Sequence, residues 1–266
     1  MTPTVAPANG TSVRAIVVAD GDVPEASLLD RSWPGWADGV DLVVAADGGA
    51  LGAARLGLRL DLVVGDMDSL APDRLAELRE SGVEIETVAA EKDESDAELA
   101  ILAALARGAT RITVLGAFGG PRLDHALANI GLLAMPALEG VAVEMLDGRT
   151  RVSALVAFDR GGRRVERRLP GRPGDLVSLL PLGTDVEGVT TAGLLYPLSD
   201  EPLRAGPARG LSNVRTGDSA SVVIRRGVLI VIETAGPAAD GNAGGSAAGH
   251  AVEHPAPGPD RRALLG

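Results

Sequence analysis

Two aspartates separated by a single residue, Asp66 and Asp68, follow an apolar run that ends at Gly65. Carboxylates this close repel each other, and each raises the pKa of the other. We therefore expect a positive group to share their space. A divalent cation is one candidate, because Mg²⁺ is usually held by one or two carboxylates together with the phosphates of a ligand.

Three further polar clusters stand, like this one, at the ends of predicted strands. They are Asp47-Gly48-Gly49, the segment EKDESD at 91–96, and the segment GAFGGPRLDH at 116–125. In open parallel sheets, ligands bind outside the carboxyl ends of the strands. The four clusters together therefore predict one site at one edge of a sheet.

The residue types in these clusters suit a phosphate and a metal ion. Asp47, Asp66, Asp68 and Asp96 offer hard oxygen ligands. Backbone N–H groups of Gly119 and Gly120, ahead of a predicted helix, can meet an anion. Arg122 can clamp a phosphate with two hydrogen bonds. Lys92, the one lysine of the chain, can neutralise charge on a transferring phosphoryl group.

Each of these residues also has a simpler interpretation. Asp96 can favour a helix N-terminus, and Gly48 with Gly49 can form a tight turn without a ligand. His125, near a helix start, is more often structural than catalytic. The sequence has no Walker A motif, and no G-x-G-x-x-G follows a strand, which disfavours the common nucleotide folds. The joint placement of the clusters is what favours a site.

Short apolar runs rich in β-branched residues predict the strands that position these clusters. The runs cover residues 13–19, 41–46, 60–64, 83–88, 111–115 and 141–146. Between them we predict helices over 72–81, 96–107 and 122–134. The first begins at Pro72 and the second follows a capping box, Ser95 to Glu98. Alternating strands and helices predict an α/β fold with a mostly parallel sheet flanked by helices.

The pattern changes near residue 150. Residues 151–234 show short β-type runs separated by turn residues, including an expected hairpin that turns at Arg226–Gly227. We interpret this part as an all-β, jelly-roll-like sandwich. The Gly-, Ala- and Pro-rich end predicts a disordered tail. The predicted organisation is an α/β domain over 12–148, a β-sandwich domain over 150–235 and a tail over 236–266.

Composition limits the classes of partner. The chain has 266 residues and a net charge of −11, which argues against nucleic acid, since phosphate backbones attract basic surfaces. It has no cysteine, and its start lacks the order of a signal peptide. No apolar run reaches the roughly 18 residues that a membrane span needs. We expect a cytoplasmic protein without a membrane partner.

The order of the motifs resembles the thiamine pyrophosphokinase family. The segments that carry the resemblance are DGG at 47–49, GDMDS at 65–69, KDESDAELA at 92–100, GAFGGPRLDHALANI at 116–130 and GLLYPLSDEPLRAGPARGLSN at 193–213. The likeness extends over residues 14–234 in the family's order. One departure is Pro121, which stands between the second glycine and Arg122.

The resemblance implies a function and a set of site residues. Members of this family transfer a pyrophosphoryl group from ATP to the hydroxyethyl group of thiamine, require Mg²⁺ and release AMP. They are homodimers that bind thiamine at the subunit interface. Carried over, the metal site comprises Asp47, Asp66, Asp68 and Asp96, and catalysis involves Asp66, Asp68, Asp96 and Lys92. ATP binding involves Asp47, Gly48, Gly119, Gly120, Arg122, Asp124 and His125, and thiamine binding involves Tyr196, Ser212 and Asn213.

The implied reaction is in-line attack of the thiamine hydroxyl on the β-phosphorus of ATP, with either Asp96 or Asp124 as proton acceptor. Two rival functions stay open at this point. One is a pyrophosphokinase for another alcohol, such as a hydroxymethylpterin, because the second half offers only Phe158 and Tyr196 as aromatic faces. The other is a nucleotide or thiamine sensor without turnover. A third alternative is a purely structural protein with acidic loops.

Overall fold

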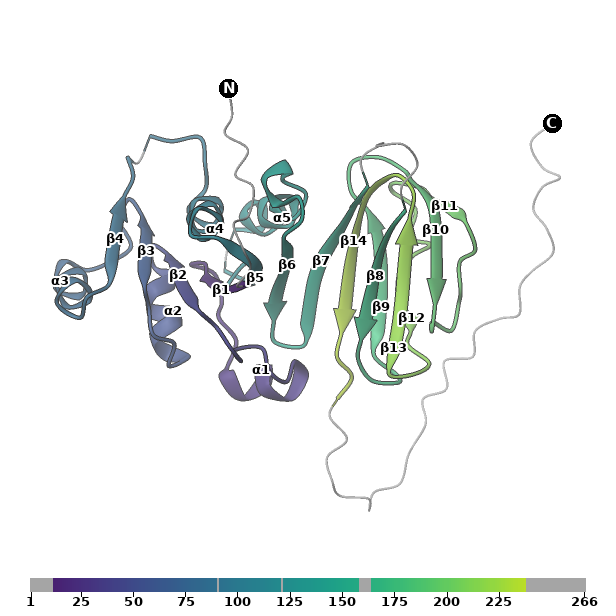
Figure 1. Cartoon of the computed structure of the whole chain (residues 1–266), viewed down its shortest axis with the longest axis horizontal. Coiled ribbons are helices and arrows are strands. Elements are labelled where there is room, and N and C mark those ends of the chain that lie inside the picture. Colours follow the sequence, from purple (N-terminus) through teal and green to yellow (C-terminus); the bar gives the residue numbers. More distant parts are fainter. Residues whose placement is uncertain (1–11, 90, 121, 158–163, 238–266) are drawn as a thin grey trace, which may run out of the picture. The chain divides into compact units, whose positions relative to one another are not determined.

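The computed structural model describes residues 12–89, 91–120, 122–157 and 164–237 (Figure 1). The predicted tail lies outside the described residues from 238 onward, and so does Pro121. The helices are α1 Ala26–Ser32, α2 Gly49–Arg55, α3 Pro72–Glu80, α4 Asp96–Ala106 and α5 Leu123–Leu132, with a 3₁₀ turn at Pro136–Leu138. The first six strands are β1 Val13–Val18, β2 Leu42–Ala46, β3 Leu62–Gly65, β4 Glu84–Thr87, β5 Ala109–Leu115 and β6 Ala142–Asp147.

These six strands form the parallel sheet that the sequence predicts. Their order is β4-β3-β2-β1-β5-β6, and every neighbouring pair is parallel. The α/β fold class is thereby confirmed. Because all carboxyl ends lie at one edge, the segments after β2, β3 and β5 are brought together there.

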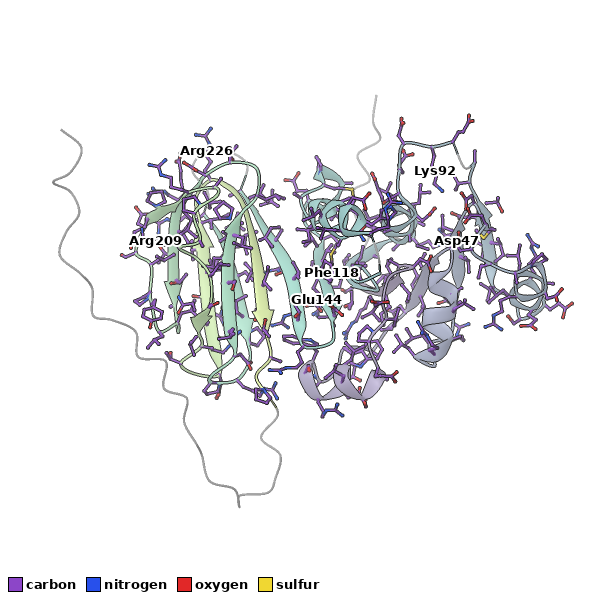
Figure 2. The ribbon with its side chains drawn as sticks, turned by 180° about the vertical axis from the view of Figure 1, so that it is seen from behind. Asp47, Lys92, Phe118, Glu144, Arg209 and Arg226 are labelled. Atoms are coloured by element: carbon purple, nitrogen blue, oxygen red, sulfur yellow. The ribbon has the colours of Figure 1, made fainter. Side chains whose placement is uncertain are left out.

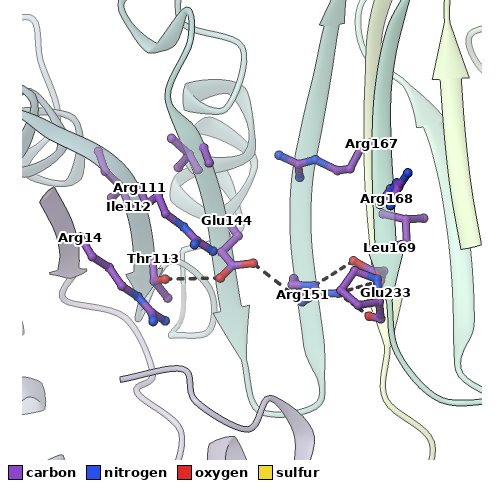
Figure 3. Close-up of a pocket in the computed structure, with 13 residues that line it drawn as sticks. Arg14, Arg111, Ile112, Thr113, Glu144, Arg151, Arg167, Arg168, Leu169 and Glu233 are labelled. Atoms are coloured by element: carbon purple, nitrogen blue, oxygen red, sulfur yellow. Dashed lines mark hydrogen bonds and ion pairs between the residues drawn. The ribbon is translucent and has the colours of Figure 1, made fainter. Parts of the chain in front are cut away.

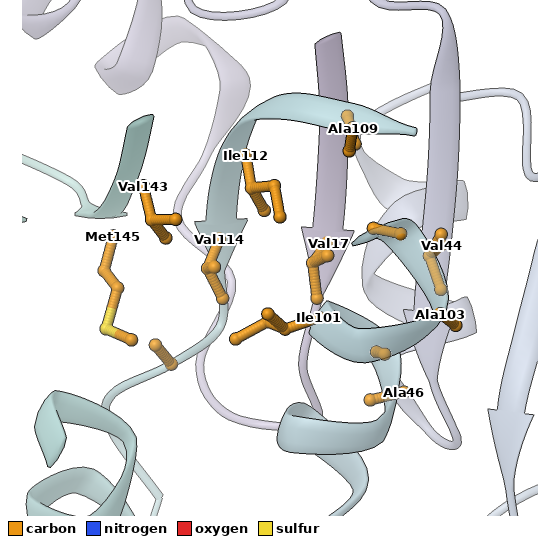
Figure 4. Packing of buried hydrophobic residues seen from close by; sticks show 14 of the residues in the cluster. Val17, Val44, Ala46, Ile101, Ala103, Ala109, Ile112, Val114, Val143 and Met145 are labelled. Atoms are coloured by element: carbon orange, nitrogen blue, oxygen red, sulfur yellow. The ribbon is translucent and has the colours of Figure 1, made fainter. Parts of the chain in front are cut away.

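Both faces of the parallel sheet are covered, which explains the unbroken apolar runs of its strands. Along β1, Ala15 and Val17 pack with Ile101 of α4, whereas Ile16 and Val18 pack in a second cluster with residues of α1 and α2. Figure 4 shows the first cluster, in which Ile101 lies over strand residues such as Val17 and Val114. Each such buried Val or Ile side chain contributes about 1.5–3 kcal/mol relative to exposure.

The second half of the chain forms the predicted β-sandwich. Its strands are β7 Thr150–Ala157, β8 Val165–Pro170, β9 Leu176–Pro181, β10 Val186–Ala192, β11 Glu201–Leu203, β12 Asn213–Val214, β13 Ser219–Ile224 and β14 Gly227–Thr234. β7, β14, β9 and β12 extend the parallel sheet beyond β6, so that the described residues form one ten-stranded sheet. A four-stranded sheet, β11-β10-β13-β8, packs against this extension through residues such as Leu155, Val177 and Val222.

The expected hairpin at Arg226–Gly227 is wrong. β13 pairs with β8 and β10 in the four-stranded sheet, whereas β14 pairs with β7 and β9 in the ten-stranded sheet. Arg226 instead forms an isolated antiparallel bridge with Glu187, and Gly227 has a φ of 107°. The turn residues therefore lie at the corner where the chain crosses from one sheet to the other. Strands β13 and β14 lie on opposite sides of the sandwich core, and both bury apolar side chains in it.

A buried ion pair holds β14, the last strand along the chain, in the ten-stranded sheet. Glu233 of β14 accepts a hydrogen bond of 2.6 Å from Arg215 and two of 2.8 Å from Arg151. Both Arg215 and Glu233 are 2% exposed.

Within the described residues, no helix is long and apolar enough to cross a membrane.

Candidate active site

Three carboxylates converge at the carboxyl edge of β2 and β3. Asp47 follows β2, and Asp66 and Asp68 follow β3. Each offers an oxygen atom, and these three atoms lie within 4.8 Å of one another. We call these residues the acidic triad. The structure therefore brings together three of the four aspartates that the resemblance assigns to a metal.

The backbone around the acidic triad is held in uncommon conformations. Asp47 has a φ of 43° and Met67 a φ of 66°, both in the left-handed region that residues other than glycine seldom adopt. Local hydrogen bonds support this shape: Ser69 N–H donates to Asp47 Oδ2 at 3.3 Å, and Asp68 N–H donates to Asp66 Oδ1 at 3.3 Å. Such strain clusters at functional sites, where surrounding contacts maintain it.

Asp47 is the buried member of the triad. It is 3% exposed, and its Oδ1 has no hydrogen-bond partner within the part of the chain that the structure describes. Burial raises the pKa of Asp47 to about 6, and the neighbouring Asp68 adds to the rise. A buried, unpaired carboxylate oxygen beside two further carboxylates fits a divalent cation such as Mg²⁺.

Lys92 supplies the positive group expected beside the triad. Its Nζ donates a hydrogen bond of 2.6 Å to Oδ1 of Asp96, and its side chain is 11% exposed. This bond raises the pKa of Lys92, and the charges of Asp66 and Asp47 act in the same direction. Asp96 thus pairs with Lys92 and stands apart from the acidic triad. Figure 2 shows Lys92 and Asp47 in the same region of the molecule.

The segment after β5 is anchored from both sides. Asn129 of α5 is buried, and its Nδ2 donates to the carbonyl of Ala117 at 2.7 Å. The N–H of Gly120, which the sequence predicts to meet a phosphate, donates to Oδ2 of Asp22 at 3.1 Å. Gly119 lies so close to Asp22 that an added Cβ would approach its Oδ2 to 2.4 Å. Asp22 therefore occupies the position expected for an anion.

Arg122 and Asp124 bind each other at the start of α5. The guanidinium makes contacts of 2.9, 3.2 and 2.5 Å with the two carboxylate oxygens, and both side chains are 63% exposed. This pairing holds the pKa of Asp124 well below its usual range. His125, next in the chain, is also exposed. These three predicted ATP ligands lie on the surface, with Arg122 turned to Asp124.

Sequence reasoning missed Asp20, which follows β1. Partial desolvation of its carboxylate raises the pKa of Asp20, although the residue as a whole is exposed, and the charges of Asp96 and Asp68 add to the rise. Gly48 packs against it, since a Cβ there would lie 2.1 Å from Asp20 Oδ1. The signal was available, because Asp20-Gly21-Asp22 ends a predicted strand as the other clusters do.

The predicted thiamine residues lie in the β-sandwich half. Asn213 is buried, and its side chain bonds the backbone N–H and carbonyl of Tyr196 at 3.0 and 2.7 Å. Ser212 has a φ of 55°, and Tyr196 is 61% exposed. Asn213 therefore holds the backbone of Tyr196 in place, whereas Tyr196 and Ser212 are exposed at the surface.

The fold and the triad together define an α/β protein with an acidic cluster at the carboxyl edge of its parallel sheet, extended by a β-sandwich. Comparison with known proteins specifies this class. The family profile "Thiamin pyrophosphokinase, catalytic domain" matches residues 36–145, and "Thiamin pyrophosphokinase, vitamin B1 binding domain" matches residues 164–229. The chain belongs to the thiamine pyrophosphokinase family.

Individual relatives agree with this assignment. Thiamine pyrophosphokinase of Bacillus subtilis is 26% identical over 200 residues, which cover 75% of this chain and 90% of that protein. A solved structure of a thiamin pyrophosphokinase family protein from Enterococcus faecalis is 28% identical, with a TM-score of 0.68 over 84% of this chain and 99% of its own. The structure of the Bacillus subtilis enzyme shares the fold, with 22% identity and a TM-score of 0.69 over 84% of this chain and 99% of its own.

Proposed function

We propose that this protein transfers the pyrophosphoryl group of ATP to the hydroxyl group of thiamine, forming thiamine diphosphate and AMP. The observation that carries the proposal is the acidic triad beside Lys92, at the edge where parallel sheets bind ligands, in a chain of this family. No covalent intermediate is needed, because phosphoryl-type transfer depends mostly on positioning and on stabilisation of charge.

Asp47, Asp66 and Asp68 are the proposed ligands of Mg²⁺. Bound there, Mg²⁺ would neutralise charge on the phosphates of ATP. The unpaired Oδ1 of Asp47 supports this role, as does the mutual distance of the triad oxygens. Asp96 acts differently in our proposal, because it holds Lys92 in place from outside the triad.

Lys92 stabilises negative charge that develops during transfer. Its side chain is largely buried, so its charge acts at lower effective dielectric than a surface lysine would. As proton acceptor for the thiamine hydroxyl, Asp96 is a better candidate than Asp124. Both carboxylates are paired with a cation, but the partner of Asp96 is Lys92 beside the triad, whereas Arg122 holds Asp124 in an exposed pair at the surface.

ATP is proposed to lie along the carboxyl edge, with Gly48, Gly119 and Gly120 close to its path. For the N–H of Gly120 to meet a phosphate, Asp22 must give up its hydrogen bond. Arg122 and His125 are exposed at the start of α5, and Arg122 can reach a bound polyphosphate only after it leaves Asp124. We therefore expect this segment to rearrange when ATP binds.

A homodimer completes the proposed site. β12, which carries Asn213, is separated from β2 by six strands of the ten-stranded sheet. At about 4.8 Å for each of the seven strand-to-strand spacings, Tyr196 and Ser212, beside β12, lie roughly 34 Å from the triad of the same chain. Thiamine cannot bridge this distance, so we propose that the triad of one copy faces the thiamine residues of the other.

Exposed apolar side chains support this assembly. Leu123 and Leu127 of α5 are 73% and 61% exposed, and Leu195 beside Tyr196 is 53% exposed. Apolar groups gathered on a surface commonly mark interfaces. Sedimentation analysis tests the proposed homodimer: we expect a dimer, and a fully active monomer would contradict it.

We further propose that the protein acts in the cytoplasm.

The reaction is tested by incubating the purified protein with ATP, Mg²⁺ and thiamine and separating the products by chromatography. We expect thiamine diphosphate and AMP in equal amounts. Formation of AMP only with another alcohol, such as a hydroxymethylpterin, would contradict thiamine as the acceptor. Metal-dependent ATP binding without any turnover would show a sensor instead.

A further inference from the structure

A second cavity lies away from the proposed active site, toward the amino ends of β1, β5 and β6. Its volume is about 280 Å³. Figure 3 shows side chains from both halves of the chain around it, with Arg14 and Arg111 from the parallel sheet and Arg167 and Arg168 from β8. The proposed active site lies after the carboxyl ends of strands of the same sheet, so the two sites occupy opposite edges.

Arginines dominate the lining of this cavity. The charged residues are Arg14, Arg111, Arg151, Arg167, Arg168, Glu144 and Glu233. The cavity is therefore cationic, within a chain whose net charge is −11. An accumulation of one sign of charge in a concave site raises the local concentration of ions of the opposite sign.

Two of the arginines, Arg14 and Arg151, already bind other groups of the protein. The guanidinium of Arg14 donates to the carbonyls of Gly35, Trp36 and Asp38 at 3.0, 2.7 and 2.5 Å. Arg151 pairs with Glu233 at 2.8 Å and lies over the ring of Trp33, 4.6 Å from its centroid. These two arginines position the walls of the cavity.

The guanidinium groups of the other three arginines are free to bind a ligand. Among the residues that the structure describes, the side chains of Arg111, Arg167 and Arg168 have neither a hydrogen bond nor an ion pair. The two carboxylates of the lining act on Arg167 only through their charge at longer range, because each is in direct contact with other groups. Glu233 is held by Arg151 and Arg215, and Glu144 lies 3.9 Å from Arg151 and accepts from Thr113 at 3.4 Å.

Arg167 is the most informative of the three. It is half-buried, and burial lowers the pKa of its guanidinium; the charges of Glu144 and Glu233 act against this shift, and the charge of Arg151 acts with it. A cation removed from water without a paired anion is unfavourable for the folded protein. An anion bound in the cavity would supply a direct ion pair for Arg167.

We propose that this cavity binds a compact phosphate-type oxyanion, with Arg111 and Arg167 as its direct ligands and Arg168 at the rim. Guanidinium groups match the oxygen geometry of phosphate with paired hydrogen bonds. The volume suits a phosphate or pyrophosphate group, since ligand pockets for drug-sized molecules begin at about 300 Å³. This site is separate from the proposed reaction and does not depend on it.

Calorimetric titration of the full chain with inorganic pyrophosphate tests the proposal. EDTA is included, because without a metal ion the acidic triad repels the anion. We expect one pyrophosphate bound per chain, and at least a tenfold weaker affinity in Arg167→Gln and in Arg111→Gln. Arg111 is exposed, so its substitution leaves folding intact even if Arg167→Gln lowers stability.

Two control variants distinguish binding in this cavity from binding elsewhere on the chain. Arg226→Gln removes the same charge at an exposed position outside the cavity and should leave the affinity unchanged. Asp66→Asn alters the acidic triad and should also leave it unchanged. Parallel titrations with phosphate, AMP and thiamine diphosphate identify the source of the oxyanion by the tightest binding. Absence of binding by all four anions, or undiminished binding in the Arg111→Gln, Arg167→Gln double variant, would overturn the proposal.

Discussion

Lys92 and Asp96 form an ion pair of 2.6 Å between Nζ and Oδ1, four residues apart at the start of α4. The pair holds the chain's one lysine beside Asp47 and Asp66, whose charges raise its pKa further. A lysine held in this way is charged at every physiological pH. Its ammonium group is therefore positioned before the phosphates arrive.

Replacing Lys92 by Met should lower kcat by about 10²–10³-fold, the loss typical when one preorganised charge-stabilising donor is removed. The expected KM for thiamine is unchanged, because in the proposed assembly thiamine is held by residues of the other copy and not by Lys92. Steady-state kinetics measure both quantities. Arg59→Met, at a side chain 85% exposed, serves as the control and should retain full activity. A Lys92→Met enzyme within threefold of wild type would exclude the role of Lys92.

Asp66→Asn should reduce turnover by orders of magnitude and weaken the activation by Mg²⁺, because the triad loses one charged ligand. The fold should persist, since Asp66 is only half-buried and makes a local hydrogen bond that Asn can keep. Turnover across a Mg²⁺ series and a thermal melt check these expectations. Glu91→Gln, an exposed neighbour of Lys92, is the matched control. Full activity of Asp66→Asn would remove the metal assignment.

Asp47 makes the metal-free protein sensitive to pH. Its carboxyl has an ordinary pKa of 3.8, which burial raises to about 6 in the folded protein. Between these values the folded state binds more protons than the unfolded state, so the free energy of unfolding falls as pH rises through this window.

Asp47→Asn should therefore raise the Tm of the protein in EDTA at about pH 7.5 by a few degrees, at roughly 2–4 °C per kcal/mol. Near pH 4, where Asp47 is protonated when folded, the gain should shrink. Calorimetric melts at both pH values measure it, and activity should be lost in the same variant. A lower Tm at neutral pH would show that Asp47 stabilises the fold.

Glu233→Gln should destabilise the protein by about 3–5 kcal/mol, because the change leaves the buried Arg215 and the largely buried Arg151 without a charged partner. Denaturant unfolding measures this loss. Glu187→Gln offers the comparison: its pair with Arg226 spans 3.8 Å, and both side chains are more than half exposed. There we expect less than about 1 kcal/mol. Equal losses in the two variants would contradict a special role for the buried pair.

Much of the α/β half could be predicted because its signals are local. Apolar runs such as 13–19 end in polar clusters, and the cap at Ser95 forms as expected, with its Oγ accepting from Glu98 N–H at 3.2 Å. The acidic triad followed from a general rule about sheet edges. Asp20 was missed although the same rule covers it.

The remaining features depend on contacts between distant segments. Whether Gly227 turns a hairpin or a corner depends on which sheet takes β14, and the turn residues themselves suit both outcomes. Likewise, no local pattern indicates that Asp22 binds Gly120, 98 residues later. The pairing of β6 with β7, which joins both halves in one sheet, also exceeds what local patterns indicate.

The most direct test of the proposed reaction follows the β-phosphate of ATP. ATP labelled at this phosphate is supplied with Mg²⁺ and thiamine, and the label is traced by chromatography. Pyrophosphoryl transfer predicts that the label appears in thiamine diphosphate, with unlabelled AMP formed in equal amount. Label retained in ADP, together with thiamine monophosphate, would show transfer of the γ-phosphoryl group alone and would contradict the proposed function.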